Sequence, residues 1–594
     1  MKYPKLRVLE SSRQMVEVFK GYNHNLRIGD GEFFDMKNMT SDHYPVLSPR
    51  GNRGIYASPT SPNGLIAKDA LCYVDGADFV INEYHVPMGL SDDPKQLISM
   101  GAYVIIMPDK MWINTSPKDE EYAFGRIEAE FDTQAAVSFS LCKLDGSNYS
   151  DAEIPTDEPG EPENMELWID TSTEPHSLKQ WSESAGMWVT IATTYVKISS
   201  PGIGTPFEKY DGITISRLKD TVLHDNVSGN VIEDTSDLAA LDGSAVVWEK
   251  GDDYIVVVGI LDVTRTISDV ITISRKMPVM DFIVESGNRL FGCRYGEAAN
   301  GEVVNEIYAS KLGDFKNWNC YMGLSTDSYA ASCGTDGQFT GAITHMGYPL
   351  FFKENCVHKV YGNYPANFQI QDTACRGVQK GCERSLAIVN ETLFYKARSG
   401  VCAYDGSLPT EVSYALGNEA YREAVGGSHG NKYYISMKDT AGESHLFTYD
   451  MAKGMWHKED DLPVEHFCSC DGEMYAISNG QIITMLGSGA KNTDPVEWMV
   501  ETGEIGISSP DMKYISRINV RMSMDIGAEA GIYAQYDHSD AWECQFVLRS
   551  TSLRSFSIPI RPKRCDHMKL RIEGVGNVRI YSITKTIEQG SDRS

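Results

Sequence analysis

The feature that most restricts the fold of this chain is a repeat of short, aromatic strand-like segments in its second half. The segments align on Phe351, Phe394, Tyr434 and Tyr475, which lie 43, 40 and 41 residues apart. An earlier segment is centred on Phe291, 60 residues before the first of these four. Each of the four marks precedes a partner segment, at 356–361, 400–405, 445–450 and 480–485. A period of about 40–50 residues that contains several short strands is typical of a β-propeller.

Similar pairs of strand-like segments occur near the start of the chain. They are residues 70–76 with 78–81, and 102–107 with 110–113. With the later repeats they predict six or seven blades, divided by an insertion. An ordinary β-sandwich also has recurring strands, but the regular spacing favours the propeller.

The predicted insertion covers residues 116–278. Its stretch 151–166 contains seven acids, no bases and three prolines, as in a solvated loop or linker. Segments 126–131, 166–170 and 186–190 alternate like strands, and a second β unit is expected over 199–264.

Six mostly alternating segments between residues 514 and 582 predict a separate sandwich or jelly roll at the C-terminus. The predicted fold class is therefore all-β: a propeller of six or seven blades with inserted β domains and a C-terminal β-sandwich. The predicted divisions are an N-terminal platform or assembly segment (1–60), first blades (61–115), the insertion (116–278), remaining blades (279–490) and the sandwich (491–594).

The charge of the chain restricts its partners. Its 594 residues include 54 Lys and Arg against 82 Asp and Glu, a formal charge of −28. This average opposes generic binding to DNA phosphates and to anionic membranes, although it leaves room for a local basic patch. The first ten residues have no apolar stretch behind their charges, and apolar runs such as 254–261 are far shorter than the roughly 20 residues of a spanning helix. We expect a soluble protein made in a cytoplasm.

Cysteine usage indicates reduced thiols. The thirteen cysteines are too sparse for a disulfide scaffold, and Cys468 with Cys470 is the only close pair. Alternate strand residues point the same way, so a metal or redox role is conceivable there. Without a second pair at zinc-finger spacing, packing as small apolar residues is favoured.

Catalytic motifs are scarce. Ser428 lies in a Gly-x-Ser-x-Gly pattern, but that nucleophile motif needs a following helix, and here a strand-like segment follows, which favours an inter-strand loop. Carboxylate pairs for sugar hydrolysis are uninformative among 82 acids. The Asp-Gly pairs at 75–76, 405–406 and 471–472 are interpreted as turns rather than calcium loops. The sequence therefore predicts no catalytic, cofactor-binding or metal residues, no cofactor, and a chain that is not an enzyme.

The one compact basic run extends from Arg561 to Arg564. Two interpretations stay open for it. It could face an acidic patch of a neighbouring subunit, or it could be a solvated strand edge protected by charge.

Both ends of the chain resemble proteins of tailed bacteriophages. Residues 19–23, 29–39 and 44–51 contain a glycine-containing segment, an acidic residue and an asparagine close together (Asp35, Asn38), then a proline and Arg50-Gly51, which is similar to the start of phage tail proteins. Residues 561–591 resemble the end of structural proteins from phages and prophages of Gram-positive gut bacteria. The architecture resembles the nozzle proteins of short-tailed phages, which combine a platform, a propeller and added β domains in a six-fold ring.

The resemblance implies a virion structural protein of the tail, nozzle- or hub-like, that forms part of the DNA-ejection conduit. It implies a homo-oligomeric ring, with a hexamer favoured, assembled in the bacterial host cytoplasm beside adaptor and fibre proteins. DNA would pass without specific binding, and an acidic wall would suit such a conduit. Two alternatives stay open: a receptor-binding tail protein that recognises glycans on the host cell surface, and a propeller glycosidase.

Overall fold

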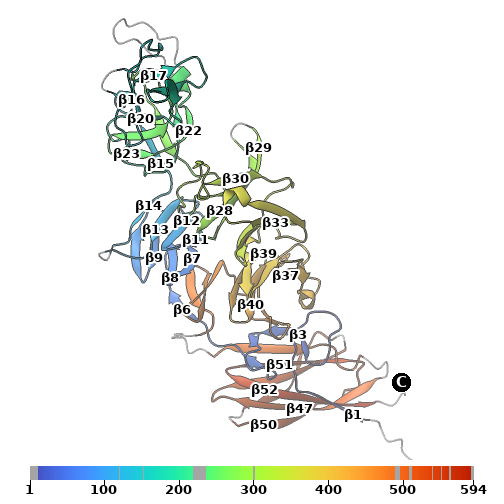
Figure 1. Ribbon diagram of the computed structural model, residues 1–594. Helices are drawn as coiled ribbons and strands as arrows, with labels where there is room; N and C mark the ends of the chain where they lie inside the picture. The colour runs from blue at the N-terminus through green and yellow to red at the C-terminus, as the bar shows by residue number, and fades with distance from the viewer. Residues whose placement is uncertain are drawn as a thin grey trace, which may run out of the picture.

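The computed structural model describes residues 11–118, 121–150, 153–218, 236–298, 301–487, 495–507, 512–537, 539–549, 552–560 and 563–589. The predicted all-β class is confirmed: within these ranges the only α-helix is α1 (Ser236–Ala239), and no helix is long and apolar enough to cross a membrane. The molecule is elongated, with a β unit at one end, a group of small sheets in the middle and two large sheets at the other end (Figure 1).

Seven units of four antiparallel strands fill the middle part (Figure 1). The first two are β7 (Pro62–Lys68), β8 (Ala70–Asp75), β9 (Asp78–Ile81) and β10 (Tyr84–Pro87), then β11 (Gln96–Met100), β12 (Tyr103–Met107), β13 (Met111–Asn114) and β14 (Phe124–Arg126). The third and fourth are β27 (Phe282–Ser286), β28 (Arg289–Glu297), β29 (Val303–Ala309) and β30 (Tyr329–Ser332), then β31 (Gly341–His345), β32 (Tyr348–Lys353), β33 (Cys356–Tyr361) and β34 (Gln369–Ala374).

The fifth and sixth units are β35 (Ala387–Val389), β36 (Thr392–Lys396), β37 (Val401–Tyr404) and β38 (Thr410–Glu411), then β39 (Arg422–His429), β40 (Lys432–Lys438), β41 (Ser444–Asp450) and β42 (Met455–Lys458). The seventh is β43 (His466–Cys470), β44 (Glu473–Ser478), β45 (Gln481–Thr484) and β6 (Gly54–Ala57). Short elements connect them: β4 (Met39–Thr40), β5 (Ser48–Pro49) and the 3-10 turns η1 (Pro365–Asn367), η2 (Glu383–Ser385) and η3 (Tyr414–Leu416).

The repeat marks fall at equivalent places in these units. Phe291, Phe351, Phe394, Tyr434 and Tyr475 all lie in the second strand of their sheet. The longer first step arises because the third unit has a nine-residue second strand and a long connection, 310–328, before its fourth strand.

Consecutive units pack face to face, and the series returns to its start. The first strands β7, β11, β27 and β31 contact one another in order, β31 contacts the turn η2 before β35, and β35, β39 and β43 follow. β43 then contacts β7, and Leu65, Leu71, Ile477 and Ile482 form the hydrophobic cluster between the seventh and first units. The fourth strand of the seventh unit is β6, in which Gly54 pairs with Thr484.

The inserted β unit leaves the second unit after β14, a strand that falls inside the predicted insertion 116–278 but pairs with β13. Its core is a hydrophobic cluster of its own. Its elements are β15 (Ala129–Asp132), β16 (Val137–Cys142), β17 (Leu167–Asp170), β18 (Ser177–Ser182), β19 (Met187–Thr190), β20 (Tyr195–Ser199), β21 (Gly212–Ser216), α1, β22 (Gly243–Val246), β23 (Glu249–Gly251), β24 (Tyr254–Val258), β25 (Arg265–Ile267) and β26 (Thr272–Arg275).

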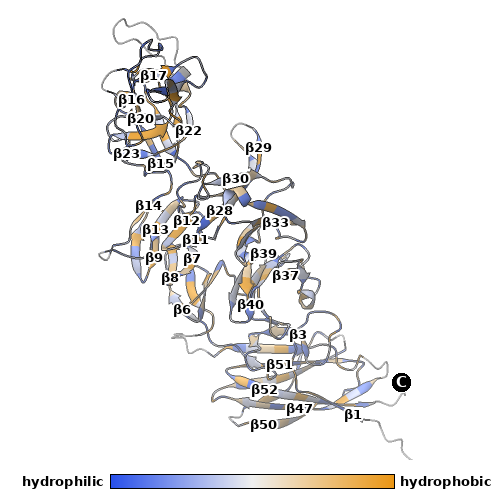
Figure 2. Ribbon diagram, viewed as in Figure 1, coloured by the Kyte–Doolittle hydropathy of each residue, from blue (hydrophilic) through white to orange (hydrophobic). Residues whose placement is uncertain are grey.

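Two sheets at the opposite end enclose a shared core. Hydrophobic residues recur along their strands (Figure 2). All six predicted C-terminal segments form strands. The elements are β46 (Glu497–Thr502), β47 (Lys513–Met524), β48 (Glu529–Tyr536), β49 (Glu543–Leu548), β50 (Arg554–Pro559), β51 (Met568–Val575) and β52 (Val578–Gln589), joined by β1 (Ser11–Val16), β2 (Gly21–Tyr22) and β3 (Glu32–Lys37). One sheet has the order β1-β52-β47-β50.

The other sheet is continuous with the sixth unit. Its order is β39-β40-β41-β42-β2-β3-β46-β51-β48-β49, so the N-terminal strands β2 and β3 join the middle part to the two-sheet end. Gly21 makes this junction possible: its φ is +82°, and a Cβ there would lie 2.3 Å from the Trp456 carbonyl oxygen. Only glycine adopts this conformation without strain and leaves room for that close approach.

Candidate functional site

A densely bonded polar site lies where the N-terminal segment, the sixth unit and the two-sheet end meet. Arg53 Nη1 donates to Asp460 Oδ2 at 2.6 Å, and Arg53 Nη2 donates to Glu459 Oε2 at 2.7 Å. Arg50 Nε donates to Asn38 Oδ1 at 2.9 Å. We call these five residues the charged joint.

Backbone bonds fix the charged joint to both of its neighbours. The Asn38 backbone NH donates to the Glu459 carbonyl, just after β42, at 2.5 Å. Its side-chain amide donates to the Glu497 carbonyl, at the start of β46, at 2.8 Å. Asn38 has a φ of 56°, which asparagine tolerates better than most residues. One asparagine therefore binds the sixth unit and the two-sheet end at once.

The charges of the joint neutralise one another away from water. The Glu459 and Arg53 side chains are only 8% and 11% exposed. Burial alone would raise the pKa of Asp460, but the Arg53 guanidinium outweighs it and holds that pKa below its usual value. The Glu459 carboxylate also accepts a hydrogen bond from Thr448 Oγ1 at 2.8 Å. All four carboxylate oxygens therefore have partners within the protein.

Two open grooves flank the charged joint, with Arg50 lining both. One, of about 1000 Å³, is lined among others by Lys37, Asp461 and Glu497. The other, of about 560 Å³, is lined among others by Asp42 and Lys432. The Lys432 Nζ lies 2.5 Å from the Asp42 carboxylate. Because the charged groups that line them are largely paired within the chain, the grooves have the chemistry of a structural seam.

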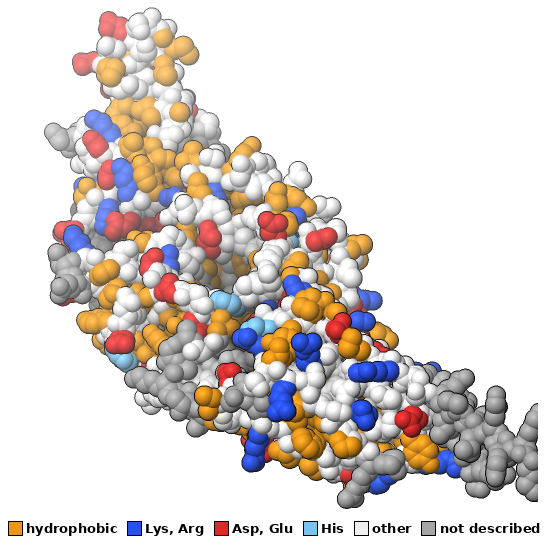
Figure 3. Space-filling model, turned by 90° about the horizontal axis from the view of Figure 1, so that it is seen from below, with side chains coloured by type: hydrophobic (Ala, Val, Ile, Leu, Met, Phe, Trp, Pro, Cys, Tyr) orange, Lys and Arg blue, Asp and Glu red, His pale blue; other side chains and the backbone are white. Residues whose placement is uncertain are grey.

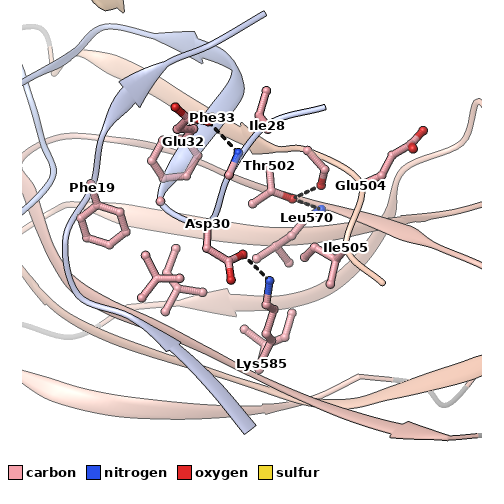
Figure 4. A pocket seen from close by; sticks show the side chains of 16 residues that line it. Phe19, Ile28, Asp30, Glu32, Phe33, Thr502, Glu504, Ile505, Leu570 and Lys585 are labelled. Carbon is pink, nitrogen blue, oxygen red and sulfur yellow. Dashed lines mark hydrogen bonds and ion pairs between the residues drawn. The ribbon is translucent and has the colours of Figure 1, made fainter. Parts of the chain in front are cut away.

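A smaller pocket of about 60 Å³ lies in the two-sheet end (Figure 4). Its walls are mainly apolar, and two hydrogen bonds close its rim. Lys585 Nζ donates to Asp30 Oδ1 at 2.6 Å, and the Gly29 NH donates to Glu32 Oε2 at 2.6 Å. The volume is well below the 300–1,000 Å³ or so of small-molecule sites. This pocket is a packing gap beneath the 28–32 loop.

A glycosidase site in the middle of the series of units would need two acids on their first strands. Those strands contain Glu285 and Glu423. The Glu285 carboxylate accepts from the Asn288 NH at 2.9 Å. The Glu423 carboxylate lies 2.7 Å from Lys438 Nζ, and this hydrogen bond lowers its pKa. Both carboxylates are held by residues of their own unit.

Ser428 lies within a strand rather than in the loop that the sequence favoured. It pairs with Tyr433, and the turn comes later, at Gly430 and Asn431. The reason is close packing against the seventh unit: a Cβ on Gly427 would lie 2.4 Å from Phe467 Cβ. The glycines thus admit a neighbouring sheet, and no strand–helix turn presents the Ser428 hydroxyl as a nucleophile.

The cysteine pair and one of the Asp-Gly pairs both lie in the seventh unit. Cys468 is a free thiol in the seventh unit, and burial raises its pKa to about 12, which disfavours a metal-binding thiolate. Asp471 and Gly472 both have positive φ, as a tight hairpin turn requires. Across the described ranges, no group of three or more His, Cys, Asp or Glu side chains could hold a metal ion.

The basic run from Arg561 to Arg564 is only partly visible, because Arg561 and Pro562 lie outside the described residues. Lys563 forms an ion pair with Glu543, and its Nζ lies 5.0 Å from the centre of the Tyr536 ring. Lys563 is therefore held against the sheet that contains β48 and β49.

No known family model matches the chain, and no curated protein matches its sequence. Solved structures do match at low identity. An exo-β-1,3-galactanase from Phanerochaete chrysosporium is 9% identical over 50% of this chain and 95% of its own, with a TM-score of 0.21. PorZ, a surface component of the type-IX secretion system of Porphyromonas gingivalis, is 11% identical over 84% and 70%, with a TM-score of 0.25. A Trypanosoma rangeli sialidase is 8% identical over 90% and 95%, with a TM-score of 0.18.

These matches correct one prediction. The sequence predicted a chain that is not an enzyme, and the matched structures include glycoside hydrolases. That exclusion is therefore withdrawn. The low scores assign neither an activity nor a catalytic residue to this chain.

Proposed function

We propose that the chain is a structural protein of a bacteriophage tail, a nozzle- or hub-like component of the DNA-ejection conduit. The observation that carries this proposal is the charged joint. Asn38 and Arg50, from the N-terminal pattern that resembles tail proteins, bind each other, and together they connect the middle part to the two-sheet end. The two residues that carry the resemblance thus help to hold the middle part and the two-sheet end rigidly together.

The proposal includes a closed seven-bladed β-propeller as the middle part. The return contact of β43 with β7 and the completion of the seventh sheet by β6 support it. Pairing the last unit with a strand from before the first unit joins the two ends of a ring. A ring of sheets that pack face to face is stiff, which suits a conduit wall.

The proposed assembly is a homo-oligomeric ring in the virion, with six copies favoured, in contact with adaptor and fibre proteins. Such a ring needs a heterologous interface that repeats around an axis. The elongated molecule offers long sides for this contact (Figure 1).

Electron microscopy of the purified protein, with its mass measured in solution, tests the proposal. Rings of six, alone or after adding a tail-adaptor protein, are the expected result. A protein absent from purified virions, or a chain that releases sugar from a glycan and stops doing so in a Glu285→Gln or Glu423→Gln variant, would contradict it.

A second candidate function is recognition of host-surface glycans, favoured by one feature of the inserted β unit. Trp168 and Trp181 each lie 5.4 Å from Trp188, ring centre to ring centre, on the three-stranded sheet β17-β18-β19. Partly exposed tryptophans offer apolar faces with a polar edge. If this function holds, Trp188→Ala abolishes binding to host cells while Trp188→Phe retains part of it.

A further inference from the structure

Charge is distributed very unevenly along this chain. Residues 116–278 contain 12 Lys and Arg against 30 Asp and Glu, a net −18. Residues 497–594 contain 13 of each, a net charge of zero. The C-terminal strands of the two-sheet end thus have no excess of acids, and this end lies opposite the acidic inserted unit (Figure 1).

The sheet β1-β52-β47-β50 has one buried and one solvent-facing side. Along β47, Ile518, Val520 and Met522 are buried. Arg517 and Arg521 alternate with them and are exposed on the outer side. Arg13 of β1 lies in the same cross-strand row as Arg517, because both pair with Thr586 of β52.

Within the described ranges, no carboxylate pairs with Arg13, Arg517 or Arg521. A fourth exposed arginine, Arg579, has its Nη2 3.4 Å from His43 Nε2. The space-filling view of this side shows Lys and Arg side chains over the two-sheet end with few acids among them (Figure 3).

Among the residues that the structure describes, the carboxylates nearest to this outer face lie at its border. Glu588 accepts a hydrogen bond from Ser516 at 2.9 Å, at the end of β52. Glu17 follows the end of β1 and is exposed.

The outer face has the chemistry of a phosphate-binding surface rather than a protein interface. Between the arginines lie the small polar side chains of Asn519, Ser555 and Ser557, and the exposed Met15 lies at the β1 edge of the same face. Arg, Ser, Thr and Asn are the side chains that commonly contact nucleic-acid phosphates. A stable protein interface would need an apolar centre, and here the outer side of β47 and β50 carries mainly arginine, asparagine and serine, with Met15 as a single exposed apolar side chain on β1.

We propose that this arginine face, made of Arg13, Arg517, Arg521 and Arg579, binds the phosphate backbone of duplex DNA independently of sequence. Arg517 and Arg521 are four residues apart on one strand, roughly 13 Å, so the face contacts several phosphates of one duplex. The inserted unit repels phosphate, so the duplex is held at this end of the molecule only. The inference goes beyond the proposed function, since a conduit needs no grip on DNA.

The test is the binding of a fluorescein-labelled 30-base-pair duplex of mixed sequence, followed by anisotropy between about 50 and 200 mM salt. With three or four phosphates neutralised, the logarithm of the binding constant should fall with log salt at a slope of about −3. The variant Arg13→Gln/Arg517→Gln/Arg521→Gln should bind at least tenfold more weakly, with a shallower slope.

A matched control removes three exposed cations elsewhere: Arg398→Gln, Arg422→Gln and Lys276→Gln. This variant should bind DNA like the unmodified chain, and both variants should keep its melting temperature. Equal loss of binding in both would make the effect one of net charge and overturn the proposal. So would wild-type binding by the arginine-face variant, or low-salt self-association that this variant alone loses. Ring formation is measured separately, so failure here leaves the proposed function standing.

Discussion

The two modules at the ends of this molecule are attached to its middle part in opposite ways. The two-sheet end is joined by strands: β2 and β3 continue the sheet of the sixth unit into it. One hydrophobic cluster also runs from the fourth, fifth and sixth units into its core. The charged joint adds a third connection, so this end and the middle part form one body.

The inserted unit is attached by a narrow polar contact. Its core is separate, and Asn317 of the third unit donates to Asp211 Oδ1 at 2.8 Å and accepts from the Gly212 NH at 2.8 Å. Lys311 Nζ donates to the Tyr210 carbonyl at 3.1 Å. Position in the sequence therefore does not indicate how tightly a segment is built into the fold. Residues 11–37 supply strands to the module formed by the other end of the chain, whereas the central insertion has a core of its own.

The largest effect should come from breaking the charged joint. Arg53→Ala leaves Glu459 and Asp460 buried without their main partner, which should lower the free energy of unfolding by about 3–5 kcal/mol. Chemical denaturation measures this. As a control, Lys276→Ala removes an exposed ion pair of the inserted unit, side chains 62% and 55% exposed, and should cost under about 1 kcal/mol. Equal losses in the free energy of unfolding would mean that the charged joint stabilises the protein no more than an exposed ion pair does.

The strand junction gives the next largest effect. Gly21→Ala forces a side chain into the left-handed region and against the Trp456 carbonyl, which should destabilise the protein by about 2–3 kcal/mol. Gly186→Ala, in an open turn of the inserted unit at φ 61° with nothing within 4 Å, supplies the strain without the contact. A similar loss in both variants would show that backbone strain alone, and not the junction, matters.

Acid should loosen the sixth unit before the inserted unit. Burial lowers the pKa of His457, in β42, to about 4. The unfolded chain therefore binds a proton more readily than the folded one, so this stability is complete above about pH 6.5 and is lost as the pH falls toward 4. At pH 5 the loss is about 2 kcal/mol. Melting curves at pH 7.5 and 5.0 should differ less in a His457→Gln variant, and an unchanged difference would contradict this cause.

The sequence predicted the parts of this fold that depend on local pattern. Aromatic marks such as Phe351 and Phe394 identified second strands because the four-strand units repeat buried aromatic positions there. The pairing of Gly54 with Thr484 left no local signal, since a strand's partner depends on the whole chain. The short, exposed strand β14 was missed for lack of apolar alternation.

The charged joint was half visible in the sequence. Asn38 and Arg50 stood out in the N-terminal pattern, but Glu459 and Asp460 are two of 82 acids, and only the fold selects them. The arginine face was hidden for a related reason. Its members come from β1, β47 and β52, so no compact basic run announces it.

Removing the inserted unit should have the smallest effect on the rest of the molecule. Ala129 pairs directly with Arg275, so the two chain passages lie side by side, and a linker of a few Gly and Ser residues can replace 129–275. The two chain passages at the base of the inserted unit are held together without it. Glu128 Oε1 accepts hydrogen bonds from Lys110 Nζ at 2.7 Å and from the Met277 NH at 3.0 Å. The shortened chain should therefore melt as the full chain does, and scanning calorimetry should show that only the transition of the inserted unit disappears. The same linker in place of residues 11–37 is the matched comparison, and it should abolish the main transition. If the two deletions cost the same, the difference between an integrated and an accessory module would be false, because the polar contact at Asn317 would then stabilise the middle part as much as strands β1 to β3 do.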